Sequence, residues 1–155
     1  MRTLKAKAVF FVILLAAVCM AQDSSVILND SRVTKQVTLN HATLFAVNGD
    51  RNVLTVNGDC DAFMLRGRQN KVIFNGAVGS VVIPGKFNIV EFNGPVQDIK
   101  VGGIANELTS RKEADKALHV EVTGDGNLLH WYHSGHKDPP DWHDLGDKNK
   151  LLPMP

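Results

Sequence analysis

The sequence predicts an all-β fold: a parallel, β-roll-like β-solenoid whose 18-residue coils each consist of two nine-residue strand-and-turn half-repeats. Three observations predict it. Glycine recurs every nine residues over seven positions, asparagine recurs every 18 residues, and apolar residues alternate with polar ones between the glycines. The glycines are Gly49, Gly58, Gly67, Gly76, Gly85, Gly94 and Gly103, and the asparagines are Asn52, Asn70, Asn88 and Asn106.

Each stretch between two glycines has the pattern of a short strand with one buried face. Alternation with a period of two places every second side chain on the same face of a strand. Turn sequences such as "NGD" and "RGR" separate the strands. The side chains expected to point inward are Phe45, Val47, Leu54, Val56, Phe63, Leu65, Val72, Phe74, Val81, Ile83, Val90, Phe92, Ile99 and Val101.

The 18-residue period predicts about five to six coils, stacked at roughly 4.8 Å so that equivalent residues lie above one another. We expect each glycine to take a positive φ where the chain reverses. The asparagines are expected at the edges, where their amides bond from coil to coil. A second column holds Asn57, Asn75 and Asn93. An antiparallel meander would explain the period of nine but not the period of 18.

The first 21 residues have the pattern of a secretory signal peptide. Arg2, Lys5 and Lys7 precede an apolar run from Ala8 to Ala21. This run of 14 residues is shorter than the roughly 20 that a membrane-spanning helix needs. Lipid attachment at Cys19 is disfavoured, because the residues before it lack the usual lipobox pattern. We therefore expect an exported protein, periplasmic or secreted, with no membrane span after cleavage.

The remaining chain divides into three parts. Residues 22–43 are expected to form an N-terminal cap or imperfect first coil, and residues 44–131 the solenoid repeats. The step from Asn106 to Asn127 is 21 residues rather than 18, and the additional residues fall in a charged loop at 110–117. Residues 132–155 should hold a loop rich in histidine and proline, a partial last coil and a tail.

Composition excludes several classes of function. Without Arg2, Lys5 and Lys7 the chain has 14 basic and 16 acidic residues, a net charge of −2, which gives no electrostatic footprint for nucleic acid. Only Cys60 remains after cleavage, so no intramolecular disulfide can form. The chain has no nucleophile elbow, P-loop or dinucleotide fingerprint. We expect no catalytic residues and no enzymatic activity.

The segment "HWYHSGHKDPPDWHD" is the candidate metal site. Neutral imidazole suits zinc and copper, and a loop can adjust to tetrahedral geometry. The other interpretation is that these are ordinary polar loop residues, in which case the protein needs no cofactor. The candidate ligands are His130, His133, His136 and His143.

The "GDxN" units, the "NGDC" at residues 57–60, and "GDGNLLHW" followed by "DLGDKN" resemble the bacterial secreted family catalogued as domain of unknown function 3060. The resemblance runs from about Phe45 to Leu152, with Arg68 and Lys86 where an aspartate is more usual. It implies an exported β-solenoid-like domain without an established activity. The expected function is a non-catalytic structural or binding module of the periplasm or cell surface, which binds an envelope partner or self-associates. The alternative is a zinc- or copper-binding protein.

Overall fold

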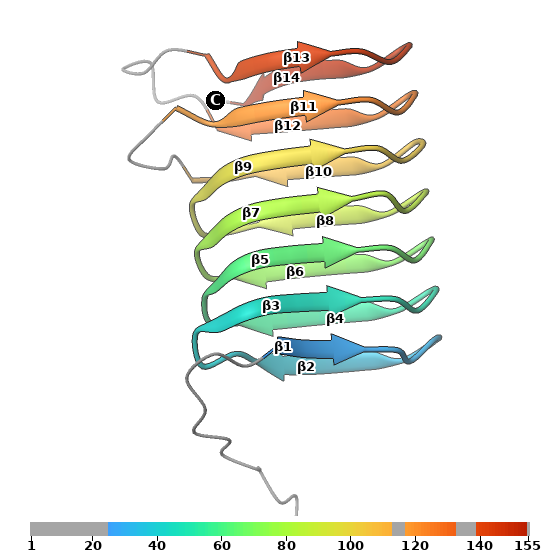
Figure 1. Cartoon of the computed structure of the whole chain (residues 1–155), viewed down its shortest axis with the longest axis vertical. Helices are drawn as coiled ribbons and strands as arrows, with labels where there is room; N and C mark the ends of the chain where they lie inside the picture. The colour runs from blue at the N-terminus through green and yellow to red at the C-terminus, as the bar shows by residue number, and fades with distance from the viewer. Residues whose placement is uncertain (1–24, 113–116, 133–138, 155) are drawn as a thin grey trace, which may run out of the picture.

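The computed structural model describes residues 25–112, 117–132 and 139–154. Within these ranges the chain forms fourteen strands and no helix, and consecutive strands alternate between two sheets (Figure 1). None of the described residues forms a helix with the length and apolar character that a membrane span requires. The residues expected to form the signal peptide lie outside the described ranges.

The first sheet contains the odd-numbered strands and the second sheet the even-numbered strands, each in sequence order. The first sheet consists of β1 (Ser25–Leu28), β3 (Ala42–Val47), β5 (Cys60–Leu65), β7 (Val78–Ile83), β9 (Val96–Val101), β11 (His119–Val122) and β13 (Asp141–Asp144). The second sheet consists of β2 (Thr34–Thr38), β4 (Val53–Asn57), β6 (Lys71–Asn75), β8 (Ile89–Phe92), β10 (Glu107–Ser110), β12 (Leu128–Tyr132) and β14 (Lys150–Met154).

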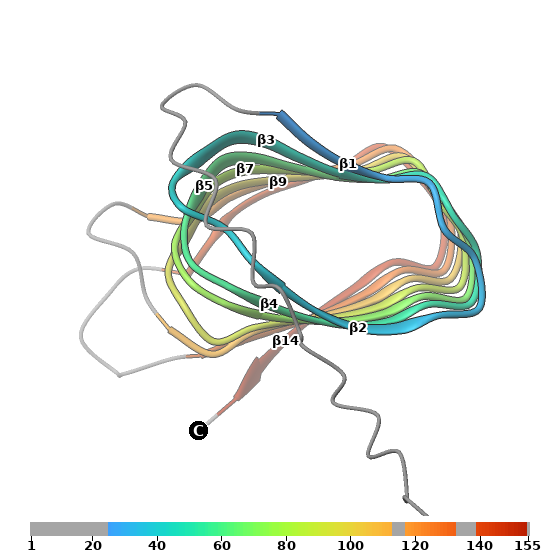
Figure 2. The same ribbon diagram turned by 90° about the horizontal axis from the view of Figure 1, so that it is seen from below.

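All neighbouring strands are parallel, and the repeat sets their register. Thr55 on β4 lies opposite Ile73 on β6, and Ile73 lies opposite Glu91 on β8, so each step is 18 residues. The predicted parallel β-solenoid is thereby confirmed, and the antiparallel meander is excluded. Seen along the stack, each coil is flattened, with the two sheets facing each other (Figure 2). The described residues form seven coils, slightly more than the five to six expected, because β1 with β2 and β13 with β14 are complete two-stranded coils.

The core lies between the two sheets and contains the side chains that the alternation predicts. All fourteen of these predicted inward residues are buried. Phe45 and Phe63 stack on each other with ring centroids 5.6 Å apart, and Phe63 packs on Phe74 at the same distance. Burying a side chain of this size contributes about 1.5–3 kcal/mol. The repeat therefore produces a continuous apolar column along the stack.

A ladder of buried asparagines runs along one edge of this core. The backbone N–H and the side-chain Nδ2 of Asn70 both donate to Oδ1 of Asn88, at 3.0 and 3.1 Å. Nδ2 of Asn88 in turn donates to the carbonyl oxygen of Gly67, at 3.0 Å. The column lies inside the turn, with Asn88 fully buried. The second column is exposed, and its amides bond only to each other, as Asn75 does to Asn57 at 2.9 Å.

The expectation that the repeated glycines take a positive φ is wrong. Gly58 is the only one of the seven with a positive φ. On the buried-asparagine edge the positive φ falls two residues later, on ordinary residues such as Gln69 and Phe87. A Cβ on Gly67 would instead lie 1.8 Å from the carbonyl oxygen of Gly49 in the adjacent coil. Glycine recurs because adjacent coils approach so closely that no Cβ fits between them.

Candidate functional site

The structure does not support the predicted metal site of four histidines. His130 lies on β12 and His143 on β13, which belong to opposite sheets. Their neighbours in each strand are the core side chains, so the two imidazoles are on the outer faces of opposite sheets. His130 has Glu107 beside it, 3.9 Å from Nε2. His133 and His136 lie outside the described residues.

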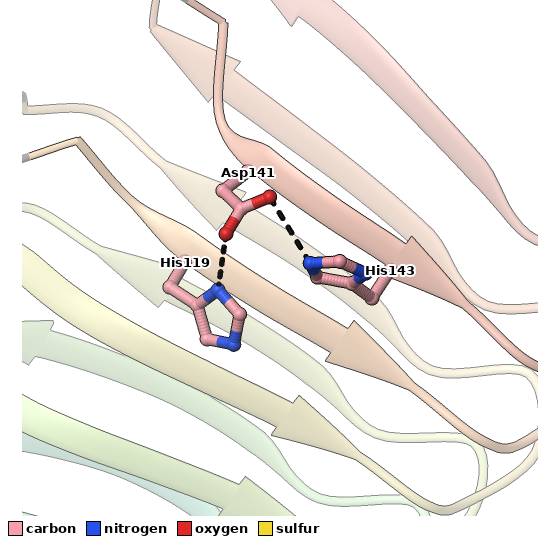
Figure 3. Close-up of side chains that lie close together, drawn as sticks. All are labelled: His119, Asp141 and His143. Atoms are coloured by element: carbon pink, nitrogen blue, oxygen red, sulfur yellow. Dashed lines mark hydrogen bonds and ion pairs between the residues drawn. The ribbon is translucent and has the colours of Figure 1, made fainter.

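A different group of possible ligands lies on the outer face of the first sheet. His119 on β11 is directly opposite Asp141 on β13, and His143 lies two residues further along β13 on the same face (Figure 3). Nδ1 of His119 is 2.9 Å from one carboxylate oxygen of Asp141, and Nε2 of His143 is 3.1 Å from the other. One ligand atom from each residue fits within 4.8 Å of the other two. We call these three residues the histidine–aspartate group.

The histidine–aspartate group is open to solvent and has acidic neighbours. The side chain of His119 is 37% exposed, and those of Asp141 and His143 are 60% exposed. Asp98 on β9 lies opposite His119, and Glu121 on β11 lies opposite His143. These neighbours make the local surface favourable for a cation.

The sequence interpretation missed His119 because it considered histidines that are close along the chain. A usable signal was present in the asparagine column, where Asn127 and Asn149 are 22 residues apart. Applying the same step to residue 119 leads to residue 141. The two strands differ in chain position but share a register, so ladder neighbours could have been paired from this step.

Cys60 lines a hollow of about 450 Å³ at the edge where the second sheet returns to the first, together with His41, Asp59, Asp61 and other residues. Its side chain is buried, and burial raises the pKa of the thiol to about 12, with the charges of Asp61 and Asp59 adding to the effect. The thiol therefore stays protonated at neutral pH and is a poor nucleophile. Cys60 is a core residue of this coil.

The turns that connect each strand of the first sheet to the next strand of the second sheet form a continuous surface, at the right of Figure 1. We call this surface the glycine–asparagine edge. The turns of its first four coils carry five exposed cations against the two carboxylates of Asp30 and Asp50. These cations are Arg32, Arg51, Arg66, Arg68 and Lys86.

The middle of the glycine–asparagine edge is apolar and its far end is acidic. Phe87 is 54% exposed and Ile104 is 39% exposed, on adjacent coils. The last two coils present Asp125, Asp144 and Asp147 with Lys148 as the one cation among their described turn residues. The edge therefore changes from basic through apolar to acidic along the stack.

Within the basic part, Arg68 has a partner on the adjacent coil. Its Nε donates to a carboxylate oxygen of Asp50 at 3.1 Å, and its backbone N–H donates to the other oxygen at 2.9 Å. These two hydrogen bonds, the backbone one first, hold the pKa of Asp50 below its usual value. Asp50 therefore stays ionised and orders Arg68 on the surface.

The comparisons with known proteins give one match. No curated protein and no solved structure matches the chain. A family model does match, and it covers β4 to β7 with the first part of β8, a shorter stretch than the resemblance seen in the sequence. That resemblance is confirmed there: residues 47–90 match the family described as a protein of unknown function (DUF3060), a description that assigns no activity.

Proposed function

We propose that the protein is an exported, non-catalytic structural module of the periplasm or cell surface that works as a pair of solenoids joined along the glycine–asparagine edge. The observation that carries this proposal is the order of basic, apolar and acidic side chains along that edge. Export is supported by the basic and apolar pattern of residues 1–21.

Such an edge is complementary to a second copy of itself. A two-fold axis between the fourth and fifth coils places the third coil of one copy against the sixth coil of the other. Arg68 of one copy then faces Asp125 of the other, and the second and seventh coils bring Arg51 to Asp147. A two-fold interface makes each of these contacts twice. Opposite charges therefore meet along its whole length.

The apolar centre of the edge lies at this axis. Phe87 combines an exposed ring with a φ of 57°, a left-handed backbone conformation that bulky residues rarely adopt. This conformation costs about 1–2 kcal/mol. Pairing would bury the ring of Phe87 and the side chain of Ile104 against their counterparts, which offsets that cost.

A non-catalytic role is supported by the way the candidate reactive groups are engaged. Cys60 keeps its proton, as argued above. Glu91, an outward-facing acid of the second sheet, accepts a hydrogen bond from Nε of Arg111 at 2.6 Å, which raises the pKa of that guanidinium. An acid held in such a pair is not free to act as a general acid.

Charge reversal tests the pairing. We expect wild-type protein to form dimers, and Arg68→Glu or Asp125→Arg to weaken dimerisation at least about tenfold, because each change places like charges together twice. The variant with both changes should regain dimerisation, since it restores opposite charges. Sedimentation velocity over a concentration series measures the dissociation constant.

Lys71→Glu provides the matched control, because Lys71 is an exposed cation on the outer face of β6, away from the edge. It should leave the dissociation constant unchanged. A wild-type protein that stays monomeric at every concentration, or a double variant that fails to recover, would contradict the proposed pairing.

A metal-binding protein is the second candidate function. It was suggested by the histidine-rich segment, and the observation that favours it is the histidine–aspartate group, which shares His143 with the four predicted ligands.

A further inference from the structure

We infer that His119, Asp141 and His143 form a binding site for one first-row transition metal ion of the Zn²⁺ or Cu²⁺ class on the outer face of the first sheet. This inference rests on the metal-binding candidate and gives it a site. It does not depend on the pairing of two copies.

The positions of the ligand atoms are close to what such an ion requires. Zinc binds imidazole nitrogen and carboxylate oxygen at about 2.0–2.2 Å, so the ligand atoms of a tetrahedral site lie roughly 3.3 Å apart. Each imidazole nitrogen is already about 3 Å from an oxygen of Asp141, at 2.9 Å for His119 and 3.1 Å for His143. The ring centroids of the two histidines are 5.5 Å apart. Side-chain rotations alone would bring the three ligand atoms to one ion.

The backbone holds the three residues in this arrangement. His119 and Asp141 are ladder partners on adjacent parallel strands, which fixes the separation of their Cα atoms. His143 follows Asp141 by two residues, so its side chain emerges on the same face. Ligands on strands have less freedom to move than ligands on a loop, and less conformational entropy is lost when they bind an ion.

The charges around the group favour a cation over the ion-free state. Asp141 is shared between two imidazoles, and Asp98 and Glu121 lie opposite the two histidines on the neighbouring strands. Glu121 is also 3.1 Å from Nζ of Lys100, so part of its charge is compensated. Two nitrogens and one carboxylate oxygen, with solvent able to provide a fourth ligand, are a donor set typical of zinc and copper sites.

Metal binding at this site would also stabilise the last coil. β13 is the final strand of the first sheet and pairs only with β11 among the described strands. An ion held by His119 on β11 and by two residues on β13 ties this end strand to the stack. Because the ion binds the folded end and not the unfolded chain, it should raise the thermal stability of the protein.

The test is titration of the full chain with Zn²⁺ and, separately, with Cu²⁺, using calorimetry for stoichiometry and thermal unfolding for stability. We expect one ion per chain and a higher Tm with at least one of the two metals. His119→Gln and Asp141→Asn should each weaken binding at least tenfold and remove the rise in Tm. Each variant should keep the metal-free Tm of wild type to within a few degrees, which shows that it folds.

Two further variants make the result specific to this group. His41→Gln changes another exposed histidine with an aspartate nearby, Asp61 at 3.6 Å, but without the third ligand, and it should bind metal as wild type does. Arg68→Glu should also bind metal normally, so failure of the dimer and failure of the metal site are distinguishable. The inference is overturned if neither metal binds saturably, or if a His133→Gln, His136→Gln variant loses binding while His119→Gln retains it.

Discussion

Replacing Gly85 with alanine is expected to destabilise the protein by about 3 kcal/mol or more. The new Cβ would lie 2.1 Å from the carbonyl oxygen of Gly67, 2.7 Å from Nδ2 of Asn88 and 2.9 Å from the carbonyl oxygen of Leu65. Two of these three atoms belong to the backbone, so the coils themselves must separate. Urea unfolding followed by tryptophan fluorescence measures the change in the free energy of unfolding.

Gly102→Ala is the matched control for this prediction. Its Cβ would meet nothing closer than Oγ1 of Thr123 at 3.4 Å, and its φ is not positive. The free energy of unfolding should therefore stay within about 1 kcal/mol of wild type. Equal losses for the two variants would show that close approach between coils is not what selects glycine.

Replacing Asn88 with alanine is the second change with a large expected effect. It leaves the buried N–H of Asn70 and the buried carbonyl of Gly67 without their side-chain partner. Each buried polar group that loses its partner costs about 1–3 kcal/mol, so we expect a loss of roughly 2–6 kcal/mol. The same urea titration measures it.

Asn75→Ala removes an equivalent amide from the exposed asparagine column. Asn75 bonds Asn57 and Asn93 through side-chain atoms alone, at 2.9 and 2.8 Å, and water can replace both contacts. The expected loss is about 1 kcal/mol or less. If Asn75→Ala were as costly as Asn88→Ala, the buried ladder would not be the main polar contribution to the stack.

The coil architecture was predictable because the repeat acts at two levels at once. The period of two within a stretch such as Phe63 to Leu65 selects the buried face, and the period of 18 selects which strands are neighbours. The two conditions together leave one arrangement, in which Phe63 lies opposite Phe45 and Val81.

The first coil was harder to recognise because it lacks the repeated residues. Asp30 occupies the glycine position, as shown by its carbonyl oxygen lying 1.6 Å from a Cβ placed on Gly49. Val33 occupies the asparagine position and donates its N–H to Oδ1 of Asn52. No other described coil lies before this one, so a Cβ at Asp30 meets no neighbouring carbonyl. The end of a stack therefore does not need the residues that define its middle.

The physical role of the glycines and the position of His119 could not be derived from local sequence. A glycine in a turn usually indicates a positive φ, whereas here a contact between coils 18 residues apart decides its place. In the same way, His119 lies beside Asp141 through a register changed by residues added in the loops. Both features depend on distances between coils, which a linear pattern does not specify.

The vertical register of the coils is tested most directly by distances between pairs of spin labels on the outer face of the second sheet. Gln36, Thr109, His130 and Leu152 belong to one column, four, five and six coils from the first. With Cys19→Ser and Cys60→Ala as the background, pulsed electron resonance from Gln36 should give about 19, 24 and 29 Å, one strand spacing per coil. A single-sheet meander would place Gln36 and Thr109 about 38 Å apart, and that distance would contradict the stacked arrangement.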